Sequence, residues 1–269
     1  MALIQANFVS KSLFRTVPIQ VILPVDKFSM TGETREQKPF KTLYLLHGIL
    51  GNYTDWVSGT RIQRWAEERD LCVVMPSGDN AFYLDNEKSG NLYGQFIGQE
   101  LVEVTRKIFR LSDRREDTFI AGLSMGGYGA IRNGLKYHDT FGYIAGLSSA
   151  IHILEPGTQH MNIAMEESCF GPLEEAVHTD RNPRVLIEQL AASGTEKPKI
   201  YMACGTEDGL IDVNRTYRDL FREKGFDLTW YEGPGGHEWD FWDREIKKVL
   251  DWLPLNDVSH GATSGSVDA

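Results

Sequence analysis

The most informative stretch of this chain is Asp117-Thr-Phe-Ile-Ala-Gly-Leu-Ser-Met-Gly-Gly-Tyr-Gly-Ala-Ile131. An apolar run leads into the pattern G-x-S-x-G, which is centred on Ser124, and small residues and helix formers follow it. Strand, sharp turn and helix form the context in which this pattern carries a nucleophilic serine. The sequence therefore predicts that the Ser124 hydroxyl stands at the turn, clear of the sheet.

The two glycines of the pattern, Gly122 and Gly126, have a steric reason. A turn this tight strains the backbone of its central residue, and we expect a Cβ at either glycine to clash. The helix that follows points its first N–H groups at the serine, which suits a developing oxyanion. The alternative is an ordinary glycine-rich connection. A nucleotide-binding loop is excluded, because the glycines do not fit G-x-G-x-x-G and no P-loop lysine follows.

Length and charge limit the class of protein. A chain of 269 residues fits one large α/β domain or at most two small ones. The formal net charge of −10 at pH 7 argues against partners such as nucleic acids or anionic membranes. We expect a small-molecule substrate instead.

Three scattered cysteines indicate no disulfide framework, so a reducing compartment is expected. Cys72 and Cys204 lie in apolar runs and are predicted to be buried thiols. The N-terminus has neither a signal-peptide pattern nor a membrane span, and the expected location is cytoplasmic.

Strand patterns alternate with helix patterns along most of the chain. Strands are predicted at residues 3–9, 15–23, 42–46, 71–75, 119–123, 141–147, 199–204 and 228–231. Helices are predicted at residues 61–69, 95–109, 127–135, 183–192, 213–224 and 241–253. This order predicts an α/β-hydrolase fold, with a mostly parallel doubly wound sheet, an antiparallel start and helices on both faces.

Two segments fall outside this regular order. Residues 150–196 have weak periodicity, and we interpret them as a cap-like insertion over the active site, or else as a peripheral helical excursion. The tail, residues 256–269, is rich in Ser, Gly and Ala and is predicted to be disordered. Residues 1–255 are then a single domain.

Three residues just past predicted strands suggest the chemistry. A serine hydroxyl needs an adjacent base, and the base needs an acid that fixes its tautomer. Ser124, Asp208 and His237 follow one another in the chain order typical of α/β-hydrolases, and each lies where a strand ends. For the acid, Glu207 and Asp212 stay open as alternatives. Among the histidines, His47 is near the site but is predicted to be structural.

Two backbone amides should complete the site. Met125 directly follows the serine, and the second donor should come from the glycine loop His47-Gly48-Ile49. We choose the Ile49 N–H, with Leu50 as the alternative. His237-Glu-Trp-Asp-Phe241 lacks the second histidine of a zinc motif, so we expect no metal and no cofactor. Apolar side chains near these loops could line a substrate pocket: Leu50, Trp56, Tyr83, Met161, Met165 and Trp239.

With these residues assembled, the chain resembles the esterase D-like α/β-hydrolases, which include tributyrin-type carboxylesterases, acetyl and feruloyl esterases and S-formylglutathione hydrolases. The resemblance lies in Leu46-His-Gly-Ile-Leu-Gly-Asn-Tyr-Thr-Asp-Trp56, Gly122-Leu-Ser-Met-Gly-Gly127, Cys204-Gly-Thr-Glu-Asp208 and Gly233-Pro-Gly-Gly-His-Glu-Trp-Asp-Phe-Trp242. It implies a nucleophile at Ser124, an acid at Asp208, a base at His237, and an oxyanion hole at Ile49 and Met125.

The loop at His47-Gly48 fits the tributyrin and feruloyl esterase branch better than the S-formylglutathione branch, which resembles Ser-Gly-Leu-Thr-Cys there. The resemblance implies a serine carboxylic ester hydrolase that forms an acyl-enzyme on short-chain acyl or hydroxycinnamoyl esters. A thioesterase or acyltransferase is the alternative, followed by a non-enzymatic binding protein. The resemblance also allows a homo-oligomer.

Overall fold

The computed structural model describes residues 1–27, 38–160, 162–255 and 262. The predicted disorder of the tail therefore falls, Ala262 excepted, on residues outside the described part of the chain. Within the described part, no helix is long and apolar enough to cross a membrane.

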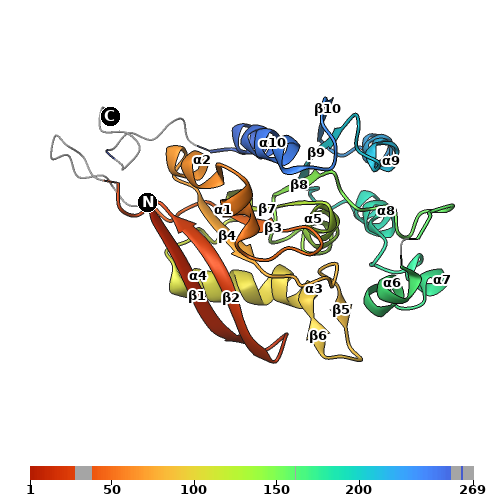
Figure 1. Cartoon of the computed structure of the whole chain (residues 1–269), viewed down its shortest axis with the longest axis horizontal. Helices are drawn as coiled ribbons and strands as arrows, with labels where there is room; N and C mark the ends of the chain where they lie inside the picture. Colours follow the sequence, from red (N-terminus) through yellow and green to blue (C-terminus); the bar gives the residue numbers. More distant parts are fainter. Residues whose placement is uncertain (28–37, 161, 256–261, 263–269) are drawn as a thin grey trace.

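An eight-stranded sheet forms the centre of the molecule, in the order β1-β2-β4-β3-β7-β8-β9-β10 (Figure 1). The first two strands pair antiparallel, β2 is antiparallel to β4, and the other pairs are parallel. This confirms the predicted fold class. The strands are β1 (Ala2–Ser10), β2 (Arg15–Leu23), β3 (Thr42–Leu46), β4 (Cys72–Pro76), β7 (Thr118–Leu123), β8 (Tyr143–Leu147), β9 (Lys199–Gly205) and β10 (Leu228–Gly233).

Helices cover both faces of the sheet (Figure 1). The predicted helices are present as α2 (Ile62–Glu68), α3 (Tyr93–Gln95), the π-helix η1 (Phe96–Glu100), α4 (Leu101–Ile108), α5 (Met125–Lys136), α8 (Pro183–Ser193), α9 (Ile211–Glu223) and α10 (Trp239–Trp252). Elements that were not predicted are α1 (Asp55–Gly59), the 3₁₀ turn η2 (Arg115–Asp117), α6 (Ile163–Phe170), α7 (Leu173–Ala176) and the short strands β5 (Asp85–Asn86) and β6 (Asn91–Leu92).

The central strands explain the two-sided core. β3 is buried along its whole length, and its successive side chains point to opposite faces of the sheet. Tyr44 and Leu46 belong to the buried cluster that includes side chains of α4, α5, α8 and α9, whereas Leu43 and Leu45 belong to the cluster that includes side chains of α2 and α10. An uninterrupted apolar strand is what a parallel sheet covered on both faces requires.

The segment 150–196 folds into α6, α7 and α8, of which α8 packs against α5. Side chains cap two of these helices: the Asn162 carboxamide accepts a hydrogen bond from the Met165 N–H, and Asn182 accepts one from the Arg184 N–H. The segment starts beside the predicted nucleophile, because the Ala150 N–H donates to the Ser124 carbonyl at 3.0 Å. Residues 150–196 therefore begin at the edge of the sheet where Ser124 lies.

Candidate active site

The turn at Ser124 has the strained geometry that its glycines suggested. Ser124 has φ +53° and ψ −118°, between the end of β7 and the start of α5. A Cβ on Gly122 would lie 2.3 Å from the Gly126 carbonyl oxygen, and one on Gly126 would lie 2.4 Å from the Leu46 carbonyl oxygen. Real Cβ atoms do not approach backbone this closely, so both positions require glycine.

Three side chains that are distant in sequence form one hydrogen-bonded chain. The Ser124 Oγ lies 2.9 Å from His237 Nε2, and His237 Nδ1 lies 2.9 Å from Asp208 Oδ2. An ionised carboxylate only accepts, so the proton of the neutral imidazole is assigned to Nδ1. His237 Nε2 is then free to accept the hydroxyl proton of Ser124, which is the geometry a general base needs.

Asp208 has the environment of a permanent carboxylate. Its side chain is almost wholly buried, and burial alone would raise its pKa. Hydrogen bonds from His237, from the Leu210 N–H at 2.9 Å and from the Ser148 hydroxyl outweigh burial and lower the pKa of Asp208. A charged Asp208 orients the imidazole and can stabilise its protonated form.

The two alternatives for the acid point elsewhere. The Glu207 carboxylate accepts a hydrogen bond from the Gly235 N–H, two residues before the imidazole. The Asp212 carboxylate pairs with Arg215 at 3.1 Å on the surface of α9. Of these carboxylates, the structure brings Asp208 to His237.

Two further residues support the imidazole, and sequence reasoning missed both. The ring of Trp242 meets the ring of His237 edge to face, with centroids 4.9 Å apart. The Trp242 Nε1–H donates to the Ser148 Oγ at 3.1 Å. Ser148 directly follows β8, so the rule that placed Ser124 and Asp208 at strand ends could have found it.

The amides near Ser124 separate the two candidates for the second oxyanion donor. The Leu50 N–H donates to the Asn80 Oδ1 at 2.8 Å and is therefore engaged. For the Ile49 N–H, the described part of the chain provides no acceptor. The Met125 N–H is the first of α5 and has no acceptor within its helix. Ile49 and Met125 thus keep amides available, and Asn80 is a contact that the sequence did not predict.

His47 holds the glycine loop from inside and is not a competing base. It is buried, its Nδ1 lies 2.6 Å from the Gly48 carbonyl, and its Nε2 accepts from the Gly78 N–H at 2.8 Å. Burial lowers the pKa of His47, which keeps the ring neutral. These contacts agree with the structural role predicted for His47.

The expected substrate contacts need correction. Trp56 is 1% exposed and donates to the Leu46 carbonyl, and Tyr83 is 0% exposed and donates to the His47 carbonyl. Neither offers surface to a substrate, because both rings fill the core below the loops. Leu50 is 86% exposed, and Trp239 is half-buried and packs edge to face on Trp56. Met165 is also half-buried, and Met161 lies outside the described residues.

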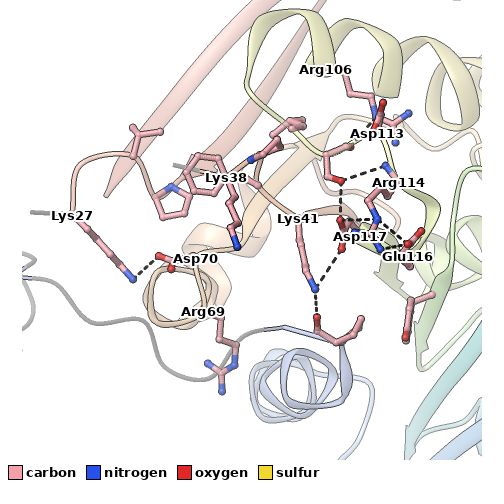
Figure 2. A pocket seen from close by; sticks show the side chains of 18 residues that line it. Lys27, Lys38, Lys41, Arg69, Asp70, Arg106, Asp113, Arg114, Glu116 and Asp117 are labelled. Carbon is pink, nitrogen blue, oxygen red and sulfur yellow. Dashed lines mark hydrogen bonds and ion pairs between the residues drawn. The ribbon is translucent and has the colours of Figure 1, made fainter. Parts of the chain in front are cut away.

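Neither of two other cavities contains the Ser124 site. One of about 1290 Å³ opens at the amino ends of the parallel strands, where Lys41 contacts Asp117 and the Pro254 carbonyl (Figure 2). A smaller one of about 320 Å³ lies between the loop of Asn80 and α6. Ser124, Asp208 and His237 line neither cavity. Chemistry in doubly wound sheets gathers at the carboxyl ends of the strands, where Ser124 is found.

Comparisons with known proteins find esterases that are similar to this chain in sequence and in fold. Residues 10–253 match the protein family described as "Putative esterase". An acetyl esterase from Caldicellulosiruptor saccharolyticus is 41% identical over 261 residues, covering 94% of this chain and 98% of that protein. The structure of an S-formylglutathione hydrolase from Staphylococcus aureus is 32% identical, with a TM-score of 0.83 over 94% of this chain and 98% of the other. A ferulic acid esterase with a TM-score of 0.76 is 21% identical over 94% of this chain and 97% of the other, and shares the fold.

Proposed function

The chain belongs to the esterase D-like family of α/β-hydrolases and is a carboxylic ester hydrolase; from this premise we propose that Ser124, His237 and Asp208 perform the hydrolysis through an acyl-enzyme. One observation carries the proposal. The hydrogen-bonded chain from Ser124 Oγ through His237 to Asp208 has both of its contacts at 2.9 Å. A hydroxyl, a base and a buried carboxylate in this order are the parts that activate a serine.

In the first half-reaction, the Ser124 Oγ attacks the ester carbonyl carbon and its proton passes to His237 Nε2. The carbonyl oxygen becomes an oxyanion and accepts hydrogen bonds from the Ile49 and Met125 amides. The tetrahedral intermediate then breaks its bond to the leaving oxygen, which takes the proton from Nε2. The alcohol departs and the acyl group stays on Ser124.

In the second half-reaction, water replaces the alcohol. His237 takes a proton from the water, whose oxygen attacks the acyl carbon, and Nε2 returns the proton to Ser124 Oγ as the acid leaves. Asp208 stays a carboxylate throughout, because its low pKa disfavours protonation. Residues 150–196 are proposed to cover the site during these steps, since the segment starts against Ser124.

Short-chain acyl or hydroxycinnamoyl esters are the proposed substrates. The 41% identity to an acetyl esterase supports a small acyl group, and the fold shared with a ferulic acid esterase is compatible with a phenolic one. A thioesterase is the second candidate, favoured by the 32% identity to an S-formylglutathione hydrolase. The serine machinery suits both, because the oxyanion forms on the carbonyl in either substrate.

The test is hydrolysis of acetyl, butyryl, octanoyl and feruloyl esters and S-formylglutathione by the wild type and by Ser124→Ala. The wild type should prefer acetyl, butyryl or feruloyl esters, and Ser124→Ala should lose roughly 10⁶-fold in kcat with its circular dichroism unchanged. Ser149→Ala is the matched control, because this neighbouring buried hydroxyl has no hydrogen-bond partner among the residues that the structure describes.

Each part of the proposal has its own contrary result. A folded Ser124→Ala variant that keeps substantial esterase activity refutes the nucleophile. A maximum at octanoyl esters contradicts the small acyl group, and a clear preference for S-formylglutathione favours the thioesterase.

A further inference from the structure

The loop before His237 has few side chains of its own that could fix its conformation. Its sequence from Gly233 to Gly236 is Gly-Pro-Gly-Gly, so proline supplies its one side chain beyond hydrogen. Gly235 has φ +138°, a conformation that side-chain-bearing residues rarely adopt. A chain with this composition is flexible unless outside contacts fix it.

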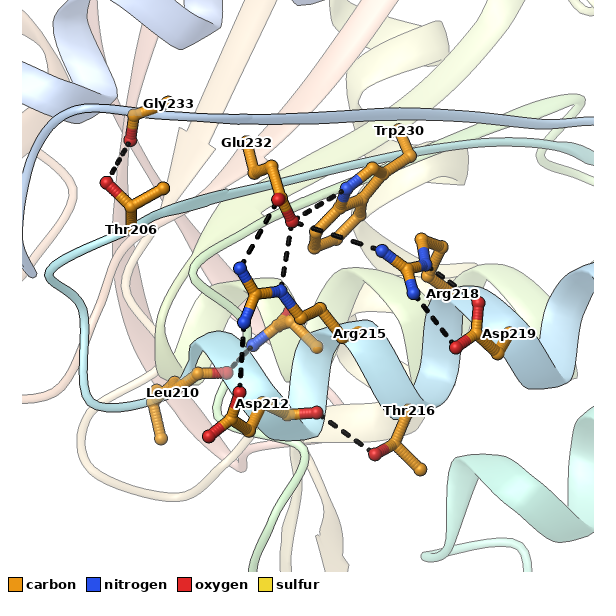
Figure 3. Close-up of polar contacts among 11 residues, drawn as sticks. Thr206, Leu210, Asp212, Arg215, Thr216, Arg218, Asp219, Trp230, Glu232 and Gly233 are labelled. Atoms are coloured by element: carbon orange, nitrogen blue, oxygen red, sulfur yellow. Dashed lines mark hydrogen bonds and ion pairs between the residues drawn. The ribbon is translucent and has the colours of Figure 1, made fainter.

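The end of β9 supplies such contacts through its backbone. The Thr206 N–H donates to the Gly233 carbonyl at 2.9 Å, and the Glu207 N–H donates to the Gly235 carbonyl at 3.1 Å. Figure 3 shows the Thr206 hydroxyl pointing at the same Gly233 carbonyl, 3.3 Å away. A Cβ on Gly205 would lie 2.0 Å from the Gly235 oxygen, so glycine there lets the two loops meet.

The Glu207 side chain adds a hydrogen bond between the same two loops in which the residue after β9 is the acceptor instead of the donor. Its Oε2 accepts a hydrogen bond from the Gly235 N–H at 2.5 Å, so Gly235 is held at both its N–H and its carbonyl. The hydrogen bond from the Gly235 N–H is the largest cause that lowers the pKa of Glu207, which keeps it a charged acceptor. The next residue, Asp208, binds the imidazole itself.

We propose that Glu207 is a positioning residue for His237: its carboxylate fixes Gly235, and through it the loop that aligns the imidazole between Ser124 and Asp208. The inference rests on the proposed function, since it assigns Glu207 to the alignment of that base. Two consecutive carboxylates thus hold one loop: Asp208 binds the His237 imidazole, and Glu207 binds the backbone N–H of Gly235.

Other polar contacts of the loop do not replace the hydrogen bond between the Gly235 N–H and Glu207. The Glu238 Oε1 accepts from the Gly236 N–H at 3.1 Å, but these residues are two apart and the bond does not tie the loop to the sheet. Arg244 donates to the Pro234 carbonyl at 2.9 Å and ties the loop to α10. Without the Glu207 carboxylate, the backbone contacts remain, so the loop should loosen rather than detach.

The test compares Glu207→Ala, Glu207→Asp and Glu207→Gln. Misalignment of a base mainly slows the chemical step, so Glu207→Ala should lose roughly 10-fold to 100-fold in kcat while KM stays within about twofold. Glu207→Gln should restore most of kcat, because its carboxamide oxygen accepts the same N–H. Glu207→Asp keeps the charge but is one methylene shorter and should resemble alanine.

Glu232→Ala is the matched control. Glu232 is an exposed carboxylate of β10, directly before Gly233. Its side chain pairs with Arg215 at 3.0 Å and accepts from the Trp230 Nε1–H at 3.2 Å, so these contacts are with α9 and β10 (Figure 3). Its removal deletes one negative charge next to Gly233 and should leave kcat unchanged.

Three results would overturn the inference: unchanged kcat in Glu207→Ala, a loss in Glu207→Gln as large as in alanine, or an equal loss in Glu232→Ala. The last two would assign the effect to charge instead of to the hydrogen bond. Ser124→Ala distinguishes a failure of the proposed function from a failure of the role of Glu207. If it is inactive while Glu207→Ala is fully active, the proposed function stands and only the role of Glu207 fails.

Discussion

The proposed nucleophile and the proposed base of this site are held in opposite ways. Ser124 is 7% exposed and lies on a turn whose glycines leave no room for a Cβ, which would meet the Gly126 backbone at Gly122 and the Leu46 carbonyl at Gly126. His237 is exposed, on a glycine loop that hydrogen bonds join to the end of β9. The position of the serine is therefore a consequence of core packing, whereas the position of the imidazole depends on a few polar contacts.

Because of this difference, we expect changes at the Ser124 turn to affect stability and changes in the His237 loop to affect turnover. Close packing cannot absorb an added atom, so changes at the turn should be felt by the whole fold. A surface loop tolerates added atoms, but a small displacement of the imidazole should reduce the rate because catalysis depends on alignment. The following predictions test this contrast, beginning with the largest effect.

Asp208→Asn should cost roughly 10⁴-fold in kcat with the fold retained, because an amide can stabilise the wrong imidazole tautomer. Steady-state kinetics and thermal unfolding of the same preparation measure both parts. Asp212→Asn is the control, since that carboxylate pairs with Arg215 on α9 and should be silent. Equal losses in the two variants would contradict the assignment of Asp208 as the acid.

Gly122→Ala and Gly236→Ala compare one glycine from each region. The first places a Cβ 2.3 Å from a backbone oxygen, whereas a Cβ on Gly236 meets no atom of the described residues within 4 Å. Urea unfolding should show that the free energy of unfolding falls by about 3 kcal/mol in Gly122→Ala and by less than about 0.5 kcal/mol in Gly236→Ala. Similar losses in both variants would show that the two regions do not differ as described.

The same contrast explains how much could be predicted from the sequence. The turn at Ser124 is local: the strand pattern, the glycines and the start of the helix pattern lie within fifteen consecutive residues, 117–131. The buried strand 42–46 and the parallel sheet follow from equally local apolar runs. These features agree with the structure because short-range sterics and burial determine them.

The features that sequence reasoning left open or missed depend on contacts between distant segments. The choice between Glu207 and Asp208 is made by the direction in which the loop turns each carboxylate. Trp56 and Tyr83 fill the core because neighbouring carbonyls accept their polar hydrogens, which no local pattern encodes. Helices such as α6 and α7 have weak periodicity, so their existence depends on packing against the rest of the fold.

The most direct test of the central claim is the reaction of the protein with a fluorophosphonate, followed by mass spectrometry. We expect one adduct, on the peptide that contains Ser124, and labelling slowed by roughly 10³-fold or more in His237→Ala, because the hydroxyl is a weak nucleophile without its base. An adduct on another residue, or labelling as fast in His237→Ala as in the wild type, would contradict it.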